Sequence, residues 1–204
     1  MSSLPFSVTL LAIITVLIFL GLGQRILDNM RLTDSAAIVI LLLMIAGHFL
    51  PSISLSPYFA VNLGGFIPLG VVIYLLVTTS RLEQRRAGLV SVLAALSIIL
   101  SDRLLPIQPG LLDPIFSGGI FAGLLATFLG RSRRSAFIAG LLGVFLVDVF
   151  NVLQLRFEGI EEQITIGGGG LFSSMVISAF LAVIIAEVIG EIREKIQLGG
   201  DHDD

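Results

Sequence analysis

The sequence contains no cysteine, one lysine (Lys195) and two histidines, His48 and His202. Without cysteine the chain can form no disulfide, thiolate nucleophile or iron–sulfur ligand. Two histidines cannot supply a His-rich zinc site, and a lysine near the C-terminus cannot serve as an intramembrane Schiff base. No long basic run is present to bind nucleic acid. We therefore predict no metal, no cofactor and no nucleic-acid partner.

Charge is also scarce. Of the 204 residues only 13% are charged, 55% are hydrophobic and the net charge is -3, and the mean hydropathy is +1.03. A soluble domain of this size needs more polar surface to cover its core. The composition predicts an integral membrane protein of the all-α class, a polytopic helical bundle whose main partner is the lipid bilayer.

Apolar runs between the charged clusters predict seven membrane spans, because a spanning helix needs roughly 20 mostly apolar residues. Residues 1–190 then form one transmembrane domain, with some helices broken at glycine or proline, and residues 191–204 form a charged cytoplasmic tail. The predicted spans cover residues 4–23, 35–50, 58–79, 87–101, 115–130, 135–155 and 166–189.

The arginines predict the orientation, because Lys and Arg are retained on the cytoplasmic side of a membrane. With seven spans and an outer N-terminus, ten of the 12 basic residues lie inside and only Arg103 and Arg156 lie outside. One span more or fewer at the start would reverse this distribution. We expect a multi-pass protein of a prokaryotic inner membrane, with its C-terminus in the cytoplasm.

Asp148 is the most informative single residue. It precedes Arg156 by eight residues, which places it roughly 12 Å below the outer boundary at about 1.5 Å per residue. An ionised carboxylate there costs about 2.5 to 3.5 kcal/mol on insertion scales. Asn151 follows on the same helix face and could hydrogen-bond it. Asp148 could be a cation or proton site, a general acid or base, or a paired aspartate that fixes helix packing.

Three glycine-rich segments lie at a similar outer depth. They could simply allow close helix packing. Alternatively, the glycines and Pro68 break helices and leave backbone groups free to line a polar cavity, and a run of four glycines predicts a bend or re-entrant segment. The predicted pocket lining beside Asp148 and Asn151 comprises Asn62, Gly64, Gly65, Gly118, Gly119, Gly168 and Gly169.

The other polar residues are expected at the surface of the protein. His48, near Pro51, is expected at the outer interface, and Asp102 with Arg103 at the outer surface, where an exposed pair contributes little. Glu187 lies at the inner end of the last span and is expected to be solvated. No G-x-S-x-G elbow accompanies any histidine and aspartate, which argues against a serine hydrolase.

The segments Asn62–Pro68, Gly140–Asp148 and Ile166–Phe172 resemble, in this order, an uncharacterised family of small prokaryotic multi-pass membrane proteins known only as a domain of unknown function. The resemblance covers about residues 62–187. Its motifs look like N-x-G-G-x-x-I-P, an intramembrane aspartate matching Asp148, and I-G-G-A-G-T-F-D-G. Ser173 stands where the last motif has its aspartate, so a two-aspartate protease is not implied. The resemblance implies no reaction.

These observations leave three hypotheses open. The first is a non-enzymatic protein that binds or transports a small solute, ion or lipid through a polar pocket around Asp148. The second is an intramembrane enzyme that uses Asp148 with Asp102 or Asp113 as acid and base. The third is a structural or assembly partner, as a homo-oligomer or with another membrane protein. The sequence names neither the substrate nor the oligomeric state.

Overall fold

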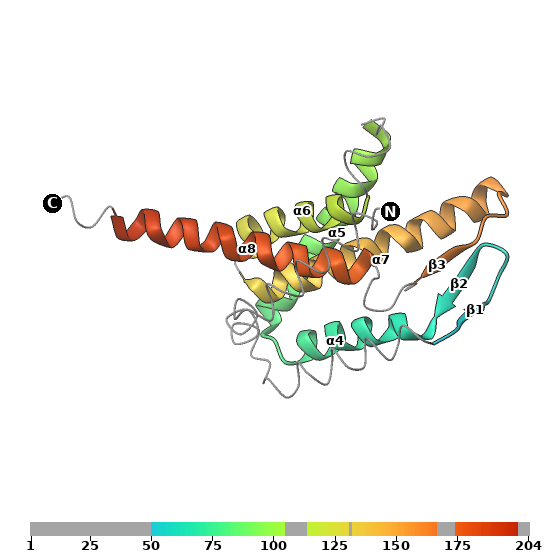
Figure 1. Cartoon of the computed structure of the whole chain (residues 1–204), viewed down its shortest axis with the longest axis horizontal. Coiled ribbons are helices and arrows are strands. Elements are labelled where there is room, and N and C mark those ends of the chain that lie inside the picture. Colours follow the sequence, from blue (N-terminus) through green and yellow to red (C-terminus); the bar gives the residue numbers. More distant parts are fainter. Residues whose placement is uncertain (1–49, 105–113, 131, 167–173, 200–204) are drawn as a thin grey trace, which may run out of the picture.

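The computed structural model describes residues 50–104, 114–130, 132–166 and 174–199. The first predicted span, the second except Leu50, and His48, Asp113, Gly168 and Gly169 lie outside these ranges. The described elements (Figure 1) are β1 (Ser52–Ser54), β2 (Phe59–Asn62), α4 (Phe66–Val77), α5 (Arg81–Leu104), α6 (Pro114–Leu125), α7 (Arg133–Glu158), β3 (Ile164–Ile166) and α8 (Ser174–Gly199).

Within the described ranges, three helices are long and apolar enough to cross a membrane: Arg81–Leu104, Arg133–Glu158 and Ser174–Ile196. At about 1.5 Å per residue each exceeds the roughly 30 Å of a bilayer's hydrocarbon core. They correspond to the predicted fourth, sixth and seventh spans and are consistent with a membrane protein. α6 is shorter and passes into a π-helical turn, Ala126–Gly130.

The predicted third span is not one continuous helix. Its first residues form β2, a 3₁₀ turn follows at Leu63–Gly65, and α4 adds only 12 residues. Twelve residues rise roughly 18 Å, well short of a bilayer core of about 30 Å. The sequence is apolar on both sides of Asn62, so its hydropathy did not reveal the change from strand to helix there. Pro68 lies in the first turn of α4, where proline is tolerated and does not break the helix.

A three-stranded sheet caps one end of the described bundle, with strand order β1-β2-β3. β1 and β2 form an antiparallel hairpin, with Ser52 opposite Asn62. β2 and β3 are parallel, with Phe59 opposite Ile164. The Gln163 side chain, next to β3, donates to the Ser56 carbonyl in the hairpin turn at 3.0 Å. The sheet thus joins the segment before α4 to the segment after α7. We call this end of the molecule the sheet end.

The opposite end, which we call the arginine end, contains the start of α5, the start of α7 and the later part of α8. α7 begins two residues earlier than predicted, at Arg133. Ser132 caps it by accepting a hydrogen bond from the Ser135 amide at 3.1 Å. At the sheet end α7 closes at Gly159, whose φ of 68° suits glycine. Helix α8 projects beyond the bundle at the arginine end (Figure 1).

Glycines bring the helices of the core into close contact. A Cβ on Gly140 of α7 would lie 2.7 Å from the Ala179 Cα and the Ser178 carbonyl oxygen of α8. Likewise, a Cβ on Gly123 of α6 would lie 2.9 Å from the Ala182 carbonyl oxygen. Because backbone cannot move aside cheaply, these glycines set the spacing of α6 and α7 against α8, as small residues do in membrane bundles.

Candidate functional site

Asn62, a predicted pocket residue, is buried at the junction of β2 and the 3₁₀ turn. Its Oδ1 accepts from the Gly64 amide at 2.8 Å, and its Nδ2 donates to the Leu50 carbonyl and to Ser52 Oγ, both at 3.1 Å. Both donor hydrogens and the carbonyl oxygen are thus engaged within the protein. Asn62 therefore stabilises the turn that precedes α4, and its side-chain amide is engaged by these three hydrogen bonds.

A small cavity of about 190 Å³ lies beside this turn, between β2, α4, β3 and α7. All the side chains around it are apolar except that of Asn62. Its lining residues are Val61, Asn62, Gly65, Phe66, Leu69, Phe145 and Ile166. Two residues of the predicted polar pocket, Asn62 and Gly65, thus border a cavity whose other side chains are apolar. Phe145 lies one helical turn before Asp148 on α7, so the cavity and the carboxyl group share one side of that helix.

Asp148 is half-buried within α7, about ten residues before the helix ends. Among the described residues, its carboxyl group forms no hydrogen bond or ion pair. Asn151 is also half-buried, and the predicted hydrogen bond between the two side chains is not formed. A carboxyl group inside an apolar helix normally faces the bundle and pairs with a neighbour. Asp148 is unusual because no described residue serves as that neighbour.

The predicted glycine segments have different roles. Gly64 and Gly65 form the 3₁₀ turn, and Gly65 borders the apolar cavity. Helix α6 runs through Gly118 and Gly119, so the predicted helix break does not occur there. A Cβ on Gly119 would lie 2.8 Å from Leu181 Cβ of α8. Close packing accounts for Gly119 without reference to a pocket.

The partners that the enzyme hypothesis needs are not seen beside Asp148. Asp102 and Arg103 are both exposed at the end of α5. The described residues include no ion pair between them; instead, the Arg103 guanidinium lies 5.9 Å from the ring centroid of Phe150 on α7. Asp113 lies outside the described residues.

The arginine end holds a network of paired polar groups that sequence reasoning missed. Arg133 of α7 forms a two-point ion pair with Glu187 of α8, through Nε to Oε2 and through Nη2 to Oε1, the second at 3.2 Å. Glu187 is buried, so the expectation that it is solvated was wrong. Its position in an apolar stretch of sequence near several arginines was the available signal.

Two further contacts extend this network from α7 to α5 and the loop before it. Arg134 is buried, and its Nη1 donates to Thr79 Oγ1 at 2.8 Å. The Ser132 hydroxyl donates to Glu83 Oε1. The arginines that served only as topology markers in the sequence therefore tie α7 to α8 and to the loop before α5, and Ser132 adds the contact to α5.

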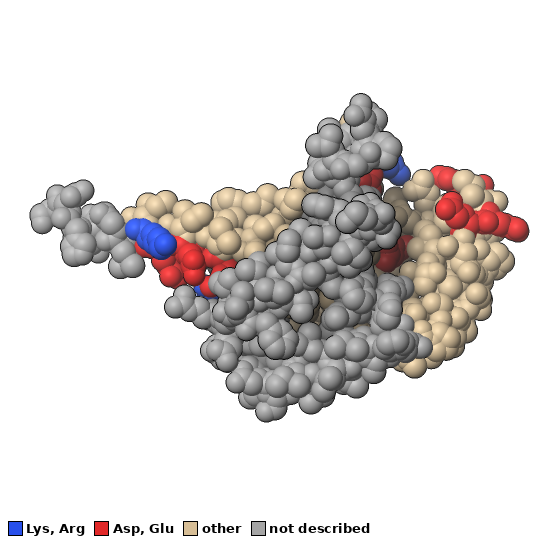
Figure 2. Space-filling view, in the orientation of Figure 1, with Lys and Arg blue, Asp and Glu red and all other residues tan. Residues whose placement is uncertain are grey.

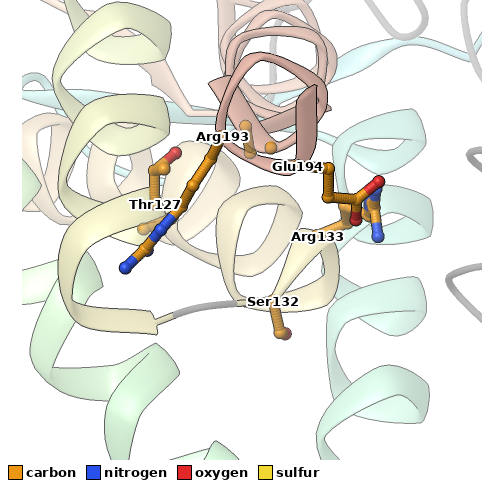
Figure 3. Close-up of a pocket in the computed structure, with 8 residues that line it drawn as sticks. Thr127, Ser132, Arg133, Arg193 and Glu194 are labelled. Atoms are coloured by element: carbon orange, nitrogen blue, oxygen red, sulfur yellow. The ribbon is translucent and has the colours of Figure 1, made fainter. Parts of the chain in front are cut away.

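An open pocket of about 330 Å³ adjoins these pairs, between the π turn, the start of α7 and α8 (Figure 3). Polar and charged side chains supply much of its wall. Its lining residues are Ala126, Thr127, Ser132, Arg133, Ala186, Gly190, Arg193 and Glu194. None of them was among the predicted site residues.

Comparison with protein families identifies the chain. A family model described as a protein of unknown function (DUF1614) matches residues 25–185. The chain belongs to this family. The match spans the sheet, Asp148 and most of α8, and it confirms membership of a domain of unknown function. Comparison with curated proteins and with solved structures found no match. The Asn62–Pro68 segment has one residue fewer than N-x-G-G-x-x-I-P between its glycine pair and Ile-Pro.

Proposed function

We propose that this DUF1614 protein is a seven-span protein of the cytoplasmic membrane that binds, and in its cellular role transports, a small cationic solute or ion. Asp148 is the proposed counter-charge, and Asn151 a polar neighbour in the same site. The site lies in the outer half of the membrane. The alternative ligand from the sequence, a lipid, would meet the same carboxyl group only if it carried a cationic head.

One observation carries this proposal: the carboxyl group of Asp148 is half-buried in an apolar helix and has no protein partner among the described residues. Burying an unpaired carboxyl group costs several times more than burying a paired one. A bound cation would provide the missing counter-charge. A purely structural aspartate would instead be expected to pair with a neighbouring helix.

The neighbouring cavity narrows the chemistry of the ligand. It is apolar, and its one amide, on Asn62, is fully engaged. A ligand that reaches both features would present a positive charge to Asp148 and an apolar part to Phe145. An organic amine fits this description better than a sugar or a carboxylate, because sugars need several hydrogen-bonding partners and an anion would be repelled.

The orientation rests on the distribution of basic residues. Arg81, Arg133 and Arg134 lie at the arginine end, whereas Arg103 and Arg156 lie toward the opposite ends of α5 and α7. Because basic residues are retained in the cytoplasm, the arginine end is proposed to face inward. Asp148 then lies in the outer half of the membrane.

The experiment compares Asp148→Asn with Asp102→Asn, which removes an exposed carboxylate from α5. The protein is purified in a neutral detergent, and its thermal unfolding is followed in Na⁺, K⁺, Mg²⁺ and choline at constant ionic strength. We expect at least one cation to stabilise the wild type and the Asp102→Asn variant. A cation concentration of 100 times Kd would raise the free energy of unfolding by about 2.7 kcal/mol. Asp148→Asn should lose this stabilisation.

Two outcomes contradict the proposal. If none of the four cations stabilises the wild type, Asp148 does not bind cations of these classes. If Asp148→Asn retains the stabilisation seen in the wild type, cations bind elsewhere and the aspartate has a structural role.

A further inference from the structure

The pocket at the arginine end has the features of an anion site. It is open, it measures about 330 Å³, and it is bordered by α8 on one side and by the π turn and α7 on the other. In Figure 3 the Arg193 side chain extends from α8 past Thr127, whereas Glu194 leaves α8 on the side of Arg133. Arg193 and Arg133 thus border the opening from different sides.

The two arginines of the pocket are in different states. Arg193 is exposed, and among the described residues it has no ion-pair partner. Arg133 is held by Glu187 through Nε and Nη2, which leaves its Nη1 hydrogens outside that pair. Glu187 neutralises most of the charge of Arg133 and fixes its position. Arg193 therefore supplies a positive charge that no described ion pair neutralises, Glu194 adds one carboxylate to the same wall, and Arg133 offers a pre-positioned donor.

The hydroxyl groups of the wall serve a different purpose. Thr127 Oγ1 donates to the Gly123 carbonyl at 2.8 Å, and Ser132 Oγ donates to Glu83. Because their hydrogens are already engaged, these groups shape the wall and contribute no donor to an anion. The donors for a ligand come from the two guanidinium groups.

The position of the pocket along the helices favours a ligand from the membrane. The apolar stretch of α7 begins directly after Arg134, and the last turns of α8, from Glu191, are charged. The pocket therefore lies where apolar helix surface gives way to charge, and Figure 2 shows both signs of charge on the projecting part of α8. This is the level of lipid headgroups, and basic pockets between helices there bind anionic lipids.

We propose that this pocket binds the phosphate of an acidic phospholipid headgroup, with Arg193 as the principal charged contact and Arg133 as the second. The lipid chains would lie along the apolar surface of the neighbouring helices. The site is separate from Asp148 and does not depend on the cation proposal.

The test uses the full chain in a neutral detergent, and the binding of phosphatidylglycerol is measured by native mass spectrometry. Arg193→Gln should weaken binding about fivefold, the effect of one basic residue near an anionic membrane surface. Glu194→Gln removes a negative charge from the wall and should strengthen binding by a similar factor. Arg86→Gln, an exposed residue of α5 at the same end, is the matched control and should leave binding unchanged.

Three further probes separate a lipid from other sources of phosphate. Phosphatidylcholine has the same phosphate without net charge and should bind more weakly than phosphatidylglycerol. Inorganic phosphate and glycerol 3-phosphate should not displace phosphatidylglycerol at equal concentration. The proposal fails if phosphatidylcholine binds equally well, if the soluble phosphates compete equally, or if Arg193→Gln and Arg86→Gln have the same effect.

Discussion

The arginine end and the middle of the bundle differ in whether the buried polar side chains of α7 and α8 have partners. At the arginine end, Arg133 pairs with Glu187, and Arg134 with Thr79. In the middle, the hydroxyl of Ser178 is buried without a hydrogen-bond partner in the described structure. Asp148 is likewise without a described partner. The two regions belong to the same helices, α7 and α8, so the difference is one of position along the bundle.

This difference distinguishes polar groups that stabilise the fold from polar groups whose burial costs the fold free energy. A paired buried charge is strongly destabilising only when its partner is removed. An unpaired polar group costs free energy as long as it is present. Substitutions of the paired residues at the arginine end should therefore lower stability. Substitutions of the unpaired groups should leave stability unchanged or raise it, and any loss they cause should be a loss of binding.

Arg133→Gln is expected to have the largest effect on stability. The Arg133 side chain is 29% exposed and that of Glu187 is 9% exposed, so the substitution leaves a nearly buried carboxylate without its counter-charge. We expect a loss of about 3 kcal/mol, the lower part of the range for buried pairs, because Arg133 itself is partly solvated. The free energy of unfolding is measured by denaturant titration in mixed micelles.

The matched control is Arg156→Gln, which removes an exposed arginine near the other end of the same helix. It should change stability by less than about 0.5 kcal/mol. Glu187→Gln should fall between the two, because the arginine it leaves behind can reach water. Equal effects of Arg133→Gln and Arg156→Gln would show that the ion pair contributes nothing to the fold.

Asn62→Ala and Asn151→Ala test the same contrast with neutral side chains. Asn62 forms three hydrogen bonds at the turn before α4. Its loss should cost about 2 kcal/mol, since a helix cap and two further bonds are removed. Asn151 has no hydrogen bond to a described residue, and its substitution should cost less than about 0.5 kcal/mol. Thermal unfolding measures both. A larger loss from Asn151→Ala would mean that Asn151 has a structural partner.

The sequence predicted the long apolar helices α5 and α7 well, because each coincides with an apolar run bounded by charge. It failed at β2. Phe59 to Asn62 are as apolar as the helix that follows, and their partner in β3 lies about a hundred residues away. No local pattern reveals such a pairing.

The candidate sites were predicted unevenly for a related reason. A carboxylate in an apolar run is visible in the sequence, so Asp148 could be identified. The pocket with Arg133 and Arg193 could not, because it depends on which faces of α7 and α8 meet. Glu187 lies near the end of an apolar run, where solvation is the common outcome. Only the packing of α8 on α7 shows that it is buried.

Ser178→Ala is the prediction with the smallest effect and the one that most directly tests the unpaired region. Ser91 of α5 provides the control, because it is also buried in an apolar helix but its hydroxyl donates to the Ala87 carbonyl at 2.8 Å. Both substitutions gain the same helix propensity. Ser91→Ala also loses a hydrogen bond, whereas Ser178→Ala relieves an unsatisfied hydroxyl. We expect the Ser178→Ala variant to be the more stable of the two by about 1 kcal/mol. If Ser178→Ala is instead the less stable variant in denaturant titration, its hydroxyl has a partner in the folded protein, and the middle of the bundle is paired as the arginine end is.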